Sequence, residues 1–135
     1  DARQLLFRTS ADGGTSFDSG GTDYQWFYNQ LDTGPTNHVS MDSSHSSINL
    51  TGNNDVGNTR EERIYGNMMI VAPGLAQRAT VTGEGFFLDQ NGNGNIIQGF
   101  GGQRKTAEAV DGFQFYFSAG NIADGVITMY GLKNA

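Results

Sequence analysis

The sequence predicts an all-β fold, a single-domain antiparallel β-sandwich built from roughly eight or nine strands. Glycine supplies 20 of the 135 residues, and no stretch is rich in Ala, Leu, Glu and Lys, which disfavours helices because glycine weakens a helix interior. Aromatic residues at 11%, together with many Thr, Val and Ile, favour strands. Short alternating segments between Gly- and Asn-rich turns are typical of a sandwich. The length fits one domain over 1–135.

The first half of the chain contains two clear strand patterns. Leu5, Phe7 and Thr9 alternate with their neighbours, and an aromatic strand runs over 24–28 after a Gly- and Asp-rich loop at 11–21. Its Trp26 is expected to anchor the core or the contact between sheets. Residues 30–58 are mostly polar and predict a long surface excursion, with 48–50 as its only strand-like island.

The second half predicts a regular succession of strands. We expect them at 62–72, 77–89, 96–100, 113–117 and 126–130. Gly66 predicts a β-bulge within the first of these, and Pro73-Gly74 predicts the turn that ends it.

The final stretch of the chain predicts a closing β-hairpin. Phe113, Phe115 and Phe117 should point to one side of a strand, with the polar residues between them on the other. After a turn over 118–125, the alternation resumes at 126–130, so the last strand is expected to complete a sheet near the end of the chain.

Charge and composition exclude several classes of partner. The net charge of −6 and the pI near 4.6 disfavour nucleic acid and anionic membrane surfaces, since both require clustered Lys and Arg, and the closest cluster is only Arg104-Lys105. There is no cysteine, so no disulfide or zinc-thiolate site can form. No apolar run reaches membrane-spanning length. The chain begins at Asp1 and enters a strand pattern almost at once, which predicts that a short N-terminal segment precedes it.

Two acidic loops could be considered as metal sites. The residues of the first are explained better as a hairpin turn, and those of the second as a solvated acidic surface. The segment 89–95 starts like a calcium loop, but its twelfth position holds Phe100 where a bidentate glutamate is needed. Its Asn-Gly pairs between apolar strands instead predict a hairpin turn. Asp12, Asp18 and Asp23 lie among glycines in the first loop, where we expect a solvated acidic surface rather than a cation cage.

Candidate catalytic residues are weak, and the sequence predicts a protein that is not an enzyme. His38 and His45 flank Asp42 in a serine-rich stretch, so a serine near a histidine is expected from composition alone. The carboxylates that could serve glycoside hydrolysis are those of an ordinary acidic surface. They are Glu61, Glu62, Glu84 and Glu108. We therefore assign no catalytic, cofactor-binding or metal-binding residue.

The two ends of the chain resemble a family of small bacteriophage virion proteins. The resemblance is carried at the start by Leu5-Leu-Phe-Arg8, Asp12-Gly-Gly14 and Tyr24-Gln-Trp26, and at the end by the 118–125 turn and Tyr130-Gly-Leu-Lys133. The middle, over 83–98, is similar only in topology. The resemblance implies a jelly-roll β-sandwich with a structural or adhesive role, and it implies no catalytic residue.

From these observations we expect a virion protein, a homotrimer that decorates the capsid or forms part of the tail or fibre. Its partners would be other copies of itself and other virion proteins, such as the major capsid protein or tail proteins. A tail receptor- or carbohydrate-binding module, with a host surface glycan as ligand, is the alternative. Its candidate stacking residues are Tyr24, Tyr28, Tyr65, Tyr116 and Tyr130. An esterase or glycosidase is the least favoured class.

Overall fold

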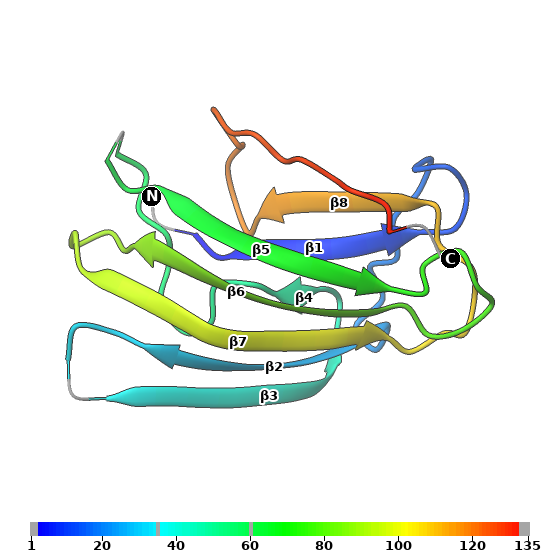
Figure 1. The fold of residues 1–135 in the computed structure, drawn as a ribbon, viewed down its shortest axis with the longest axis horizontal. Helices are drawn as coiled ribbons and strands as arrows, with labels where there is room; N and C mark the ends of the chain where they lie inside the picture. The colour runs from blue at the N-terminus through cyan, green and yellow to red at the C-terminus, as the bar shows by residue number, and fades with distance from the viewer. Residues whose placement is uncertain (1–2, 35, 60, 133–135) are drawn as a thin grey trace.

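The computed structural model describes residues 3–34, 36–59 and 61–132, and these residues form two antiparallel β-sheets and no helix. In chain order the strands are β1 (Leu5–Ser10), β2 (Tyr24–Leu31), β3 (Asn37–His45), β4 (Ile48–Asn49), β5 (Ile64–Val71), β6 (Thr80–Leu88), β7 (Gly94–Arg104) and β8 (Gly112–Phe117). The smaller sheet has the order β4-β1-β8 and the larger one β3-β2-β7-β6-β5, and Figure 1 shows them as two layers. The predicted all-β, antiparallel architecture is confirmed.

The smaller sheet is held together by the pairing of the first strand with the last. β1 and β8 pair in register from Leu5 opposite Phe117 to Ser10 opposite Gly112. Within this sheet the ring of Phe7 lies 5.9 Å from that of Phe113 and 5.2 Å from that of Phe115. The three phenylalanines of β8 pack against the core, as the alternation predicted.

The strand pairing of the larger sheet is irregular at three points. Register shifts occur between Gly83 and Gly85 in β6 and at two points in β2, whereas β5 pairs with β6 without interruption. The bulge predicted at Gly66 is therefore wrong, and the extra residue lies instead in β7, where the three residue steps from Phe100 to Ile97 span the two from Gly83 to Gly85 of β6. The turn predicted at Pro73-Gly74 is confirmed.

The core lies between the two sheets. Its fully buried centre is formed by Phe7 and Ile48 of the smaller sheet and by Tyr24, Phe87 and Ile97 of the larger one. Trp26 packs against this cluster and stacks on Tyr28 at 5.6 Å, which confirms its predicted role as an anchor.

The predicted surface excursion over 30–58 is wrong for most of its length. It contains β3, a nine-residue strand that the polar sequence does not predict, whereas the strand-like island predicted at 48–50 is confirmed by the buried β4. β3 is an edge strand whose two faces are both largely open to solvent, so its stability does not require an apolar alternation. Polar residues are therefore sufficient to form this strand, and its polar sequence predicts a loop instead.

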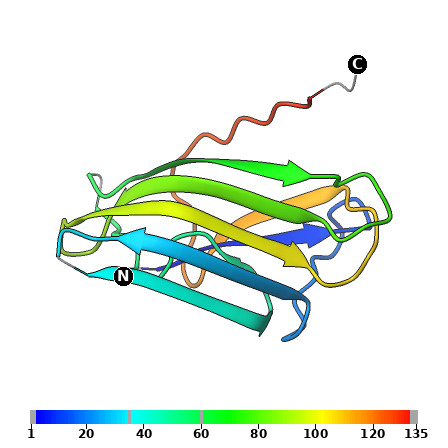
Figure 2. The ribbon, with the colours of Figure 1, turned by 60° about the horizontal axis from the view of Figure 1, so that its bottom comes forward.

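The predicted closing strand at 126–130 is also wrong. No strand is present between 118 and 132, and this stretch leaves the two sheets beyond β5 (Figure 2). Its apolar side chains are among the most exposed of the described residues, with Val126 at 90% and Tyr130 at 84%. β8 is consequently an edge strand of the described sheet.

Candidate functional site: the apolar outer face of the larger sheet

The side of the larger sheet that faces away from the core carries two rows of side chains that run across the strands. We call this side the outer face. The first row follows the pairing from Met41 through Phe27, Gly101 and Thr82 to Met69. It crosses five strands, or about 19 Å at the usual strand spacing.

The second row crosses the same sheet nearer the β6–β7 turn. Leu31 pairs with Ile96, Ile96 with Phe86, and Phe86 with Tyr65. Apolar residues of the core are almost fully buried, whereas Tyr65 is 60% exposed and Ile96 50%. The outer face is therefore an apolar surface that remains open to solvent.

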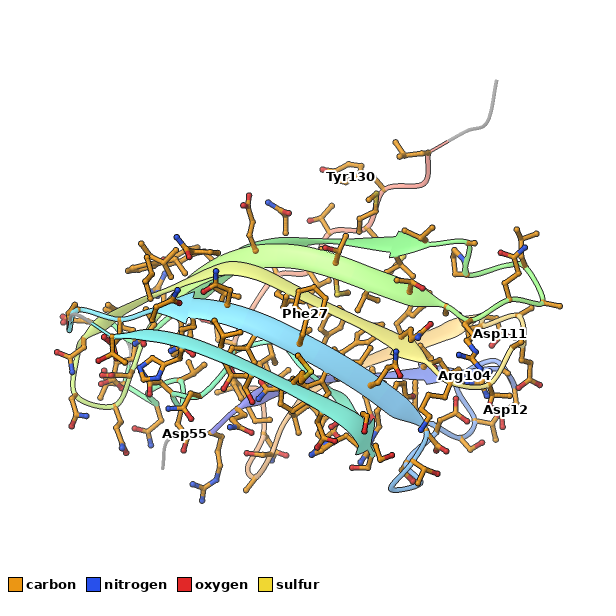
Figure 3. The ribbon with its side chains drawn as sticks, turned by 90° about the horizontal axis from the view of Figure 1, so that it is seen from below. Asp12, Phe27, Asp55, Arg104, Asp111 and Tyr130 are labelled. Carbon is orange, nitrogen blue, oxygen red and sulfur yellow. The ribbon has the colours of Figure 1, made fainter. Side chains whose placement is uncertain are left out.

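Glycine shapes the middle of the outer face. An added Cβ at Gly101 would lie 2.5 Å from the ring of Phe27, so only glycine lets this ring lie flat over the neighbouring strand. Phe27, labelled in Figure 3, is nevertheless 54% exposed. The ring is thus held against the sheet below and is free to contact a partner above.

A polar strip separates the two apolar rows. Asn67 donates a hydrogen bond to Glu84 at 3.1 Å, and Gln98 lies beside them in the same shallow depression. Among the strand residues of this sheet, Arg104 is the only lysine or arginine, and it is buried. The outer face therefore suits an uncharged or mixed partner and does not suit a polyanion.

Arg104 instead fastens the first loop to the larger sheet. Its Nη2 donates to Asp18 at 3.0 Å and to Glu108 at 2.9 Å, and its Nε lies 2.7 Å from the second Asp18 oxygen. Burial opposes the charge, but these carboxylates outweigh burial and raise the pKa of Arg104. Figure 3 shows this end of the molecule, with Asp12 and Asp111 nearby.

The three aspartates of the first loop have separate partners and do not converge. Asp12 accepts hydrogen bonds from the side chain and backbone of Ser16 and from Ser10, which together lower its pKa to about 2. Asp18 pairs with Arg104, and Asp23 accepts from the amide of Gly20 at 2.6 Å. Their carboxylates organise the loop through hydrogen bonds, and Asp12 lies exposed to solvent as expected, while Asp18 and Asp23 are partly buried.

The segment 89–95 is a hairpin turn, as predicted. Leu88 pairs with Gly94, and Asp89 accepts the amides of Asn91 at 2.8 Å and Asn93 at 3.0 Å. Burial alone would raise the pKa of Asp89, but the hydrogen bonds from Asn93 and Asn91 outweigh it and the pKa is lowered. The carboxylate that would have bound calcium is occupied by its own turn.

The histidines lie at opposite ends of β3 and face different partners. His38 Nε2 is 2.9 Å from an oxygen of Asp32, and this hydrogen bond is the main cause of the lowered pKa of Asp32. His45 Nδ1 is 3.4 Å from the hydroxyl of Ser47, which is fully buried and so cannot meet a substrate. The structure thus places no accessible serine beside the imidazole of His45.

The candidate carboxylates are also dispersed. Glu62 accepts the amide of Thr59 at 2.7 Å, Glu84 is bound to Asn67, and Glu108 to Arg104. Over the described ranges no three His, Asp or Glu side chains are grouped as a metal site would need. The described residues also include no helix with the length and apolar character that crossing a membrane requires.

The tyrosines divide into buried and accessible ones. Tyr24 and Tyr28 are 0% and 5% exposed, and burial raises the pKa of both, so neither can stack on a sugar. Tyr116 lies under the guanidinium of Arg8, 4.6 Å from the ring centre. Tyr65 and Tyr130 remain accessible.

Sequence reasoning missed the outer face, although a signal for it exists. Adjacent apolar pairs recur in the strands, namely Met68-Met69, Ile70-Val71, Phe86-Phe87 and Ile96-Ile97. Because neighbouring residues of a strand point to opposite sides, such pairs place apolar side chains on both faces of a sheet. One member of each pair serves the interior and the other the outer face.

Comparisons with known proteins find no matching family model, no matching curated protein and no matching solved structure.

Proposed function

We propose that this protein is a structural component of a bacteriophage particle that attaches to other virion proteins through its outer face. The observation that carries the proposal is the pair of apolar rows left open on the larger sheet. Monomeric soluble proteins rarely expose apolar patches of this extent unless a partner covers them. The resemblance of both chain ends to virion proteins supports the particle as the place where that partner lies.

The strand order supports a jelly-roll-type sandwich within this proposal. β1 pairs with β8 and β2 with β7, which is the nested pairing of first with last that a jelly roll has. The inner strands depart from the pattern, because β6 pairs with its neighbours β5 and β7 rather than with β3. The proposed fold is therefore a jelly roll in its outer strands with a meander in place of its inner ones.

The proposed mechanism is burial of surface without turnover. Phe27, Met69 and Tyr65 would enter a complementary apolar surface, while the amides of Asn67 and Gln98 would hydrogen bond at its wet centre. If the partner is the capsid lattice, the protein would stabilise the assembled shell against heat, since it binds only the assembled state. On a tail or fibre the same face would join neighbouring subunits.

The test compares serine substitutions of apolar residues whose exposed fractions are nearly equal. Met69, at 53%, lies in the outer face, and Leu75, at 54%, lies in a loop away from it. We expect Met69→Ser together with Phe27→Ser to abolish co-sedimentation with particles of the source phage that have been stripped of the protein. Leu75→Ser should sediment like the unaltered chain. Equal sedimentation of all variants, or absence of the chain from intact particles, would contradict the proposal.

A second function, recognition of a host glycan, is favoured by Tyr65. Its exposed ring borders the depression that also holds Asn67, Glu84 and Gln98, and this combination of an aromatic platform with amide and carboxylate groups suits a sugar. Glycan-array binding that is lost in Tyr65→Ala and kept in Tyr116→Ala would support it. If no glycan on the array is bound, this second function is ruled out and only the structural role is retained.

A further inference from the structure

We infer that residues 126–132 of one copy of this protein add as a strand to the free edge of β8 in a second copy. The inference concerns the smaller sheet and leaves the outer face untouched, so it stands independently of the proposed function. It rests on the incomplete interior beside β8, on the character of the β8 edge, and on the sequence and position of the C-terminal segment.

The interior of the sandwich is open on one side. β4 contacts β2 and β7, so the order β4-β1-β8 places β8 toward β6 and β5. The core-facing residues on this side remain only partly buried although they pack against the core. They are Ile64, Met68 and Ile70 of β5 and Phe113, Phe115 and Phe117 of β8. One further strand beside β8 would cover them.

The edge of β8 lacks the usual protection against strand addition. Natural edge strands carry charged residues, prolines or bulges that prevent another chain from pairing with them. Gly112–Phe117 contains no charged residue and no proline, and its pairing with β1 is unbroken. A regular row of backbone donors and acceptors is thus available along the outer side of β8.

The C-terminal segment has the properties of the absent strand. From Gly125 to Leu132 it contains no charged residue, and Val126, Ile127, Met129 and Tyr130 give it strong β propensity. The same four side chains are between 62% and 90% exposed. Such a segment gains both backbone hydrogen bonds and apolar burial by pairing with an edge.

The position of the segment favours a second copy as the recipient. Figure 2 shows the chain after β8 reversing direction and running outside β5, away from the β8 edge, and Figure 3 places Tyr130 clear of the molecule. The β8 edge of the same chain is left unpaired. The segment projects from the body, and the edge that it matches is empty in the same chain. When identical copies exchange such segments, each edge is filled by a neighbour and a symmetric dimer or trimer closes.

The absence of cysteine makes a direct test possible. Gln114→Cys places a thiol on β8, and Val126→Cys, Thr128→Cys or Tyr130→Cys places one on the segment, which scans the register. We expect a mixture of the Gln114→Cys chain with one of the segment variants to form a disulfide-linked pair of twice the chain mass of 14.5 kDa. Each variant incubated alone is the control for random collision.

The assembly state provides the second measurement. The full chain should have a mass about two to three times that of one chain by light scattering. Thr128→Pro, which removes a backbone donor from the strand, should reduce the mass to that of a single chain, whereas Ala123→Pro in the preceding loop should not. A single-chain mass for the unaltered protein, or a disulfide that forms within one chain of the double variant Gln114→Cys, Thr128→Cys and not between mixed chains, would overturn the inference.

Discussion

The two edges of the smaller sheet differ in how completely the chain itself covers them. At the β4 edge Ile48 and Leu50 are almost fully buried, whereas every residue of β8 at the opposite edge is only partly buried. The same sheet is therefore closed on one side by its own chain and open on the other. We infer from this difference that the β4 side contributes more to the stability of the fold, and we propose that the β8 side is the one at which copies associate.

Buried amides explain why the β4 side can be closed by polar sequence. Gln30 donates to Asn95 at 2.8 Å and accepts the amide of Asn53 at 2.7 Å, and Asn54 donates to Asn95 at 2.6 Å. Asn49 accepts the amide of Thr51 at 3.0 Å and fixes the turn after β4. The buried side chains of Gln30, Asn49 and Asn95 thus all have partners, and the loop is tied to both β2 and β7.

The largest contrast is expected between two isoleucines on the two sides. Both substitutions are placed in the Thr128→Pro chain, so that strand exchange does not cover β8. Ile48→Ala should lower the free energy of unfolding by about 2–5 kcal/mol, because it opens a cavity in a fully buried site. Ile70→Ala should cost about 1 kcal/mol, because that side chain is only partly buried. Urea unfolding measures both, and equal losses would refute the contrast.

The amide network should contribute the next largest effect. Gln30→Leu keeps the volume but leaves the Asn53 amide and part of Asn95 without partners, so we expect a loss of about 1–3 kcal/mol in the free energy of unfolding. Gln98→Leu, on the exposed outer face, is the matched control and should change it by less than about 0.5 kcal/mol. A neutral Gln30→Leu would mean that the network does not stabilise the closed side.

Glycine-to-alanine substitutions in β7 test how tightly the β4 side is packed. An added Cβ at Gly102 would lie 2.9 Å from both the Gln25 carbonyl oxygen and the side chain of Ile48, so Gly102→Ala should destabilise by about 1–3 kcal/mol. Gly99, in the same strand, has nothing within 4 Å of such an atom. Gly99→Ala is therefore expected to be neutral or slightly stabilising in thermal unfolding. A tolerated Gly102→Ala would show that the closed side is loosely packed.

The smallest expected effect is a pH dependence at the end of the molecule where β8 begins. Hydrogen bonds from Ser16 and Ser10 lower the pKa of Asp12 from 3.8 to about 2 in the folded chain. A lowered pKa means that the stabilisation is present above the unfolded value of 3.8 and is lost as the pH falls toward 2. The melting temperature of Asp12→Asn should therefore drop less than that of the unaltered chain between pH 5 and pH 2. Glu61→Gln is the control, and an identical drop in Asp12→Asn would contradict the assignment.

Most of the fold could be predicted from the sequence because most strands have one buried face. The alternations in 5–9 and 113–117 and the Asn-Gly turn before 96 are imposed by the core and by turn geometry, and the structure has strands and a turn there. β3 could not be predicted, because an edge strand with two open faces needs no apolar period. The error lies in treating polarity as evidence against a strand.

The candidate site and the chain end were beyond single-sequence reasoning for a different reason. The pattern at 126–130 indicates a strand but does not say which edge it pairs with, and the described chain leaves it unpaired. The outer face depends on which residues lie opposite one another, such as Phe27 and Gly101, and register is set by bulges that no local pattern revealed. Tertiary pairing decides both features.

We propose that association completes the open side of the molecule, and hydrogen exchange in the full chain distinguishes a covered β8 edge from a free one. Backbone amides of 126–130 and of β8 should be protected together in the full chain at high protein concentration, and should lose protection together on dilution or in Thr128→Pro. The β4 side should stay protected throughout. Exchange of 126–130 at the rate of an unstructured peptide at every concentration would contradict the account.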